Sequence, residues 1–272
     1  MNKFIKAIGF AGLMGLSAGA VAAPVTVGGV TWDPDSGIDF SLDSSFMEQS
    51  VIVNPGDELT GFGQVGSLNG DAGFCASCEL TFEFGGLSAT SVDIDTGSVD
   101  TDFSSSTGLV IEVDFEFTGG WVNLYVDSST AFDNTDGSTA TDGDLWLGLA
   151  FDTNVLELLG HTAGTSLRAT NVLVAYDDKG TMDTTDDEVL FNEVVQGSGL
   201  GYLSAVEVAL GGAGIGGLSQ VFENFNTDEQ PNEVLGLSDL RLTSQFGTQQ
   251  TPDNIILNGN TVPEPTSLAL LG

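Results

Sequence analysis

The chain contains two cysteines, and their spacing permits three kinds of chemistry. Cys75 and Cys78 stand in Phe74-Cys-Ala-Ser-Cys-Glu79. A redox-active pair needs its first thiol at a helix N-terminus, where the dipole lowers the thiol pKa, whereas the residues after Cys78 alternate as a strand. A zinc site needs two more nitrogen or sulfur ligands, and the chain has a single histidine, His161. In an exported chain the pair would most simply form a local disulfide.

No other residues form a recognisable catalytic set. His161 lies in a polar turn, Leu159-Gly-His-Thr-Ala-Gly164, and no Gly-x-Ser-x-Gly elbow supports a Ser-His-Asp triad. The 39 acidic residues make chance pairs of carboxylates certain, so no glycosidase pair can be assigned. We therefore expect a protein without catalytic residues.

Two clusters of carboxylates have the ligand type that Ca²⁺ prefers. The first lies in a Gly/Thr-rich loop and comprises Asp133, Asp136, Asp142 and Asp144. Its spacing is not that of an EF-hand, because the acids do not fall in register with a glycine at position six and a glutamate at position twelve. A solvated turn is the alternative interpretation.

The second cluster is denser and lies in one predicted connection between strands. Its members are Asp177, Asp178, Asp183, Asp186 and Asp187, followed by Glu188. Carboxylates this close in sequence either bind a cation or remain as crowded like charges. The sequence thus predicts Ca²⁺ as the one candidate cofactor, in at least one of the two loops.

The charge balance excludes whole classes of partner. Five Lys and Arg stand against 39 Asp and Glu, which gives a formal net charge of -34. Such a polyanion repels nucleic acid and anionic membranes and attracts cations. We expect no nucleic-acid binding.

Hydrophobic residues alternate with polar ones in short runs, as in half-buried strands. In Leu109–Phe117 the odd positions are apolar and positions 112, 114 and 116 are acidic. Gly119-Gly120 then precedes Trp121–Val126, so a hairpin is expected there. Cys78–Phe84 alternates in the same way. Further predicted strands are 25–32, 58–65, 145–151, 171–176, 188–195, 203–210 and 237–242, and a short helix is predicted at 154–159.

Many short strands separated by turn residues predict an all-β protein, specifically an antiparallel β-sandwich or jelly-roll-like single domain with few or no helices after the signal peptide. We place this domain at residues 23–244. The segment 245–261 is polar and rich in Pro, Asn and Gly, and we interpret it as a stalk.

The first 22 residues have the pattern of a secretory signal peptide. Lys3 and Lys6 precede an apolar run, and small residues follow at Ala20, Ala22 and Ala23. Because Pro24 would hinder cleavage directly before it, we expect the cut after Ala22 instead of Ala23. Export removes two of the five basic residues and leaves Arg168, Lys179 and Arg241.

The last eleven residues resemble the start of a PEP-CTERM sorting signal. Val262, Pro263, Glu264 and Pro265 are followed by a few apolar residues, far fewer than the roughly 20 that cross a bilayer. In that family the motif leads into a membrane-spanning helix and a basic tail, which an exosortase-type enzyme processes. We expect residues 262–272 to be a truncated sorting segment, with the membrane reached only through the missing helix.

Two further segments resemble the PepA family of flocculation-associated PEP-CTERM proteins. They are Gly28-Gly-Val-Thr-Trp-Asp-Pro-Asp-Ser36 and Phe74-Cys-Ala-Ser-Cys-Glu-Leu-Thr-Phe82, and Gly119–Tyr125 fits as well. The resemblance implies an exported, non-enzymatic protein of Gram-negative bacteria, located at the cell surface or in the extracellular matrix. It also implies a role in floc or biofilm formation together with secreted exopolysaccharide.

Two other functions fit the same sorting tail, because the tail specifies location and not activity. One is a carbohydrate-binding or carbohydrate-active domain. The other is a structural matrix protein that assembles with copies of itself through exposed sheet edges. For the flocculation function, a Ca²⁺ bridge from the acidic domain to acidic polysaccharide or to copies of the protein itself is the expected mechanism.

Overall fold

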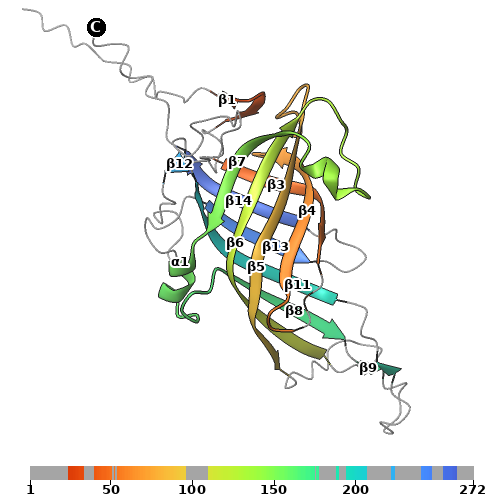
Figure 1. The fold of residues 1–272 in the computed structure, drawn as a ribbon, viewed down its shortest axis with the longest axis vertical. Helices are drawn as coiled ribbons and strands as arrows, with labels where there is room; N and C mark the ends of the chain where they lie inside the picture. The colour runs from red at the N-terminus through yellow and green to blue at the C-terminus, as the bar shows by residue number, and fades with distance from the viewer. Residues whose placement is uncertain are drawn as a thin grey trace, which may run out of the picture.

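The computed structural model describes residues 24–33, 40–50, 52, 54–95, 110–174, 176–177, 188–189, 194–206, 222–223, 240–246 and 254–261. Most of them are in strands (Figure 1). The strands are β1 (Val25–Val27), β2 (Val30–Trp32), β3 (Phe40–Gln49), β4 (Glu58–Leu68), β5 (Glu79–Asp95), β6 (Val110–Asp127), β7 (Asp144–Phe151), β8 (Leu167–Val174), β9 (Tyr176–Asp177), β10 (Glu188–Val189), β11 (Val194–Ala205), β12 (Phe222–Glu223), β13 (Leu240–Phe246) and β14 (Asn254–Thr261). The helices are η1 (Gly137–Ala140) and α1 (Thr153–Leu158).

Within the described residues, eight strands form one closed antiparallel sheet. They follow the order β3-β4-β5-β6-β7-β11-β13-β14, and β14 pairs back to β3 through Leu257 and Leu42. The all-β antiparallel domain expected from the alternation is therefore confirmed. Each strand pairs with the next one along the ring, so the connections are those of a meander and no jelly-roll crossing occurs in this ring.

Strands β7 and β8 occupy one position in the sheet. Both lie between β6 and β11, with β7 against Trp121–Val126 of β6 and β8 against Val110–Phe117. They are thus two parts of one long strand, interrupted by residues 152–166, which contain α1 and His161. Leu158 on this excursion is 63% exposed.

The interior of the closed sheet is filled by side chains from all its strands. Phe82 and Phe84 of β5 pair across the sheet with Gly63 and Gly61 of β4, and their rings occupy the space that side chains at the glycines would need. Such pairing of an aromatic residue with glycine packs a strand closely against its neighbour. A cavity near Met47 and Ser244 measures about 20 Å³, which is room for about one water molecule.

The β1–β2 hairpin covers one end of the sheet. Trp32 packs edge-on against Phe40 and Trp146, and the indole nitrogen of Trp146 donates to the Val27 carbonyl at 2.9 Å. The loop before β5 completes this end, because the Thr31 amide donates to the Phe74 carbonyl at 2.8 Å. The two segments on which the family resemblance rests, 28–36 and 74–82, therefore contact each other through residues that the structure describes.

Four predictions require correction. The single strand expected at 25–32 is wrong, because Gly28 and Gly29, with φ angles of 61° and 89°, form the turn between β1 and β2. The hairpin expected at Gly119-Gly120 is wrong, because β6 continues through both glycines and stays paired with β5. Their positive φ angles of 72° and 102° do not reverse the direction of the chain. The stalk expected at 245–261 is wrong over Asn254–Thr261, which forms β14 with Ile255 and Leu257 buried. Strand β3 lies in a segment for which no strand was predicted.

Candidate functional site

A shallow, open hollow on the outer surface lies between β3, β4 and the connection from β6 to β7. Its volume is about 700 Å³. Its lining residues are Ser45, Phe46, Gln64, Ala131, Phe132, Asp133 and Asn134. We call it the outer groove.

A bulge in β3 explains why a phenylalanine of this strand faces outward. Phe40 and Leu42 point into the core, and strict alternation would also turn residue 46 inward. The pairing of β3 with β4 shifts between Ser44 and Phe46, which leaves Ser45 unpaired. The extra residue reverses the alternation, so Met47 is buried in the core and Phe46 stands on the outer face.

Three phenylalanines form the floor beneath the connecting loop. Phe46 and Phe62 come from β3 and β4, and Phe132 comes from the loop. Their ring centroids lie 5.7 Å apart for Phe46 and Phe132 and 6.3 Å apart for the other two pairs. All three side chains are only half-buried. This outer aromatic cluster holds the loop against the sheet while leaving ring surface open to the groove.

The carboxylates of the loop shape its own backbone. Asp127 accepts hydrogen bonds from the backbone amides of Ser129 and Thr130, both at 2.8 Å, and these bonds hold its pKa below the ordinary value. Asp133 accepts from the hydroxyl of Thr135 at 2.7 Å and from its amide at 2.9 Å, which also lowers the pKa of Asp133. Each carboxylate thus satisfies amides that the turn leaves unpaired.

The predicted calcium ligands are placed as follows. Asp136 caps η1 by accepting from the amide of Ser138 at 3.0 Å, and Asp142 and Asp144 are exposed. Among the residues that the structure describes, no three His, Cys, Asp or Glu side chains are grouped so that they could hold a metal ion. In the second cluster the structure describes only the backbones of Asp177 and Glu188, which lie opposite each other in β9 and β10; Asp178, Asp183, Asp186 and Asp187 lie outside the described residues.

Polar side chains under the loop connect it to the sheet. The Thr81 hydroxyl donates to the Ala140 carbonyl at 2.8 Å, and the Gln64 amide donates to Glu79 at 2.9 Å. Burial raises the pKa of Glu79; the Phe132 amide and Gln64 oppose this rise, and the charges of Asp127 and Asp142 add to it. Gln64 therefore both lines the groove and supports a partly buried carboxylate.

The cysteines belong to the covered end of the sheet. Cys75 and Cys78 are linked as a disulfide, with their Cα atoms 5.3 Å apart. The sulfur of Cys75 lies 3.5 Å from the Gly29 carbonyl, in the turn of the β1–β2 hairpin. The disulfide thus lies against the hairpin turn and not at the N-terminus of a helix.

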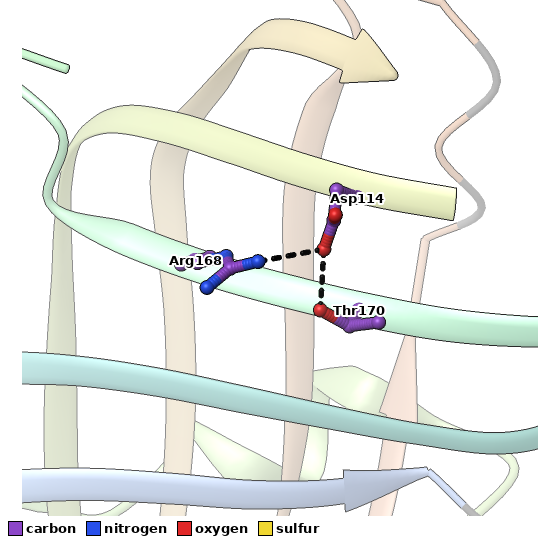
Figure 2. A network of polar contacts seen from close by, with 3 residues as sticks. All are labelled: Asp114, Arg168 and Thr170. Carbon is purple, nitrogen blue, oxygen red and sulfur yellow. Dashed lines mark hydrogen bonds and ion pairs between the residues drawn. The ribbon is translucent and has the colours of Figure 1, made fainter. Parts of the chain in front are cut away.

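A second polar network lies on the outer face of β6 and β8 (Figure 2). One carboxylate oxygen of Asp114 accepts from the Arg168 guanidinium at 3.1 Å and from the Thr170 hydroxyl at 2.6 Å. Asp93 lies directly across from Asp114 on β5, so Arg168 offsets like charges on adjacent strands. Both members of the ion pair are about two-fifths exposed, which limits its contribution to stability.

Scans against protein-family models, curated proteins and solved structures find no match to this chain. No helix in the described part of the chain is long and apolar enough to cross a membrane. The predicted cleavage residues Ala20, Ala22 and Ala23 and the motif Val262–Pro265 lie outside the described residues.

The aromatic cluster was not predicted from the sequence. Phe46 and Phe132 are far apart in the chain, and only the bulge in β3 turns Phe46 toward the loop. A partial signal was available in Phe132, a large aromatic residue within an otherwise polar and acidic loop. Such a residue usually needs an apolar partner elsewhere in the fold.

Proposed function

We propose that this protein is an exported, non-enzymatic component of the cell surface or extracellular matrix that promotes floc formation by binding exopolysaccharide. The family resemblance of segments 28–36 and 74–82 suggests this role. The observation that carries the proposal is the outer groove, where phenylalanine rings and polar side chains line a hollow large enough for a sugar.

The closed sheet favours a binding site on its outer surface over one in its interior. Its interior retains a cavity of about 20 Å³ near Met47 and Phe84, which is too small for a monosaccharide. Aromatic side chains bind the apolar faces of sugar rings, while amides, hydroxyls and carboxylates bind their hydroxyl groups. Phe46 and Phe132 offer the first kind of contact, and Asn134 and Asp133 offer the second.

Calcium bridging remains an additional hypothesis that rests on the net charge of -34. A diffuse layer of divalent cations around the acidic surface would let it approach acidic polymers. A chelator would then weaken flocs without affecting binding in the groove.

The test is the settling of a strain from which the gene has been deleted. We expect the deletion strain to lose aggregation while it still secretes polysaccharide, and the complete gene to restore flocs. Chemical quantification of the secreted polymer serves as the control. A deletion strain that settles like its parent would refute the proposed function.

One observation favours self-assembly as a second candidate. Strand β5 pairs with β4 only as far as Ser88, so among the described residues Ser91–Asp95 pairs with β6 alone and leaves its other edge open. An open edge can recruit another strand, although Asp93 places a charge on it that discourages such pairing. Concentration-dependent assembly of the purified protein without polysaccharide would favour this candidate.

A further inference from the structure

The outer groove combines two features that together indicate the chemistry of its ligand. Its floor contains the rings of Phe46 and Phe132, whose centroids are 5.7 Å apart. Neither ring is fully buried. The face of an aromatic ring attracts both the C–H face of a pyranose and a cation, because its π-electrons are partly negative.

The rim of the groove carries a carboxylate with an unused oxygen. Both hydrogen bonds of the Asp133 side chain go to Oδ1, so within the described residues Oδ2 accepts none. The hydrogen bonds from Thr135 lower the pKa of Asp133 and so favour its ionised carboxylate. Oδ2 of Asp133 is therefore available to a donor, above all to a positively charged one.

No positive charge of the chain competes for this carboxylate nearby in sequence. No Lys or Arg occurs between Lys6 and Arg168, a stretch that includes every residue of β3, β4 and the β6–β7 loop. Glu79, Asp127 and Asp142 add negative charge beneath and beside the loop. The groove thus repels uronate or sulfate groups and attracts cationic ones.

We propose that the outer groove binds a polysaccharide through amino sugars that carry a free ammonium group. The sugar ring lies over Phe46 and Phe132, the ammonium group donates to Oδ2 of Asp133, and the hydroxyl groups contact Ser45 and Asn134. This inference rests on the proposed function, because it takes a polysaccharide as the partner and names its chemical class.

The test compares glucosamine oligomers with N-acetylglucosamine oligomers of equal length, titrated calorimetrically into the purified protein at mildly acidic pH, where free amines are protonated. We expect the cationic oligomers to bind more tightly and oligogalacturonate not to bind. Asp133→Asn keeps the hydrogen-bond acceptor for Thr135 but removes the charge. It should weaken binding of the glucosamine oligomers about two- to fivefold and leave the N-acetylated oligomers unaffected.

Two further variants distinguish specific binding in the outer groove from nonspecific electrostatic attraction. Glu157→Gln removes one exposed negative charge on α1, away from the groove lining, and should leave binding unchanged. Phe46→Leu keeps apolar volume but removes a ring, and should weaken both oligomers. Equal effects of Asp133→Asn and Glu157→Gln on the binding of glucosamine oligomers would contradict the proposal. So would polylysine that binds as tightly as these oligomers and whose affinity is unchanged by Phe46→Leu. Either result would show that binding depends on overall charge alone.

The outcomes also separate this inference from the proposed function. If polysaccharide purified from the strain binds while glucosamine oligomers do not, the flocculation function stands and the amino-sugar inference fails. If glucosamine oligomers bind specifically but the deletion strain settles normally, the amino-sugar inference stands and the flocculation function fails.

Discussion

The inner and outer faces of β4 use aromatic side chains in opposite ways. On the inner face, Gly61 and Gly63 leave room for the rings of Phe84 and Phe82, which are at most 6% exposed. On the outer face, Phe62 contacts Phe46 and Phe132 in a cluster that is only partly exposed. Strand β4 therefore packs against buried rings of β5 on its inner face and contributes one ring to a partly exposed aromatic cluster on its outer face.

The largest effect should come from the inner face. In Gly63→Ala the new methyl group would collide with the Phe46 carbonyl and the Phe82 ring. Since neither can move without disturbing the sheet, we expect a loss of about 3 kcal/mol in the free energy of unfolding, measured by urea denaturation. The control is Gly73→Ala, whose methyl group would meet only the Asp71 carboxylate, at 3.2 Å, and should change stability little.

An intermediate effect is expected where the loop joins the sheet. Asp127→Ala removes the acceptor for the amides of Ser129 and Thr130 and should cost about 1–2 kcal/mol. Because the native pKa of Asp127 is lowered, the cost should be full above the ordinary aspartate pKa and should shrink as pH falls through the lowered native value. Asp142→Ala removes the same charge from the loop without these bonds. Equal losses in both variants would contradict this role for Asp127.

The smallest effect should have the opposite sign. The raised pKa of Glu79 means that its ionised form destabilises the folded state at neutral pH. Glu79→Gln should therefore raise the melting temperature at neutral pH. The gain should disappear as pH falls below the ordinary value of 4.5, because the wild-type carboxyl is then protonated in both folded and unfolded states. A gain that does not change with pH would show that charge is not its cause.

Local alternation in the sequence was sufficient to predict much of the sheet. The apolar positions of Cys78–Phe84 and Leu109–Phe117 predicted the inward faces of β5 and β6, because each side chain's direction follows from its place in the strand. The same rule failed for β3, where the bulge at Ser45 breaks the period. It also failed for β14, where asparagines and a glycine suggested a stalk.

The candidate site was less predictable because it depends on contacts between distant segments. The acidic residues drew attention to the loop at 133–144, but in the structure Asp133 and Asp136 bind their own turns. The groove arises only when Phe132 reaches Phe46, some 86 positions earlier in the chain. No local sequence pattern predicts a contact between two residues so far apart in the chain.

The seam between β3 and β14 sets the order in which the chain can fold. The Ile255 amide donates to the Ser44 hydroxyl at 2.8 Å across 211 positions, whereas most other strands pair with near neighbours in sequence. The meander from β3 to β6 can assemble early, but the ring cannot close before β14 has left the ribosome. Until β14 is in place, β3 and β13 each have an unpaired strand edge. The nascent chain is therefore prone to aggregate with other chains until its synthesis is complete.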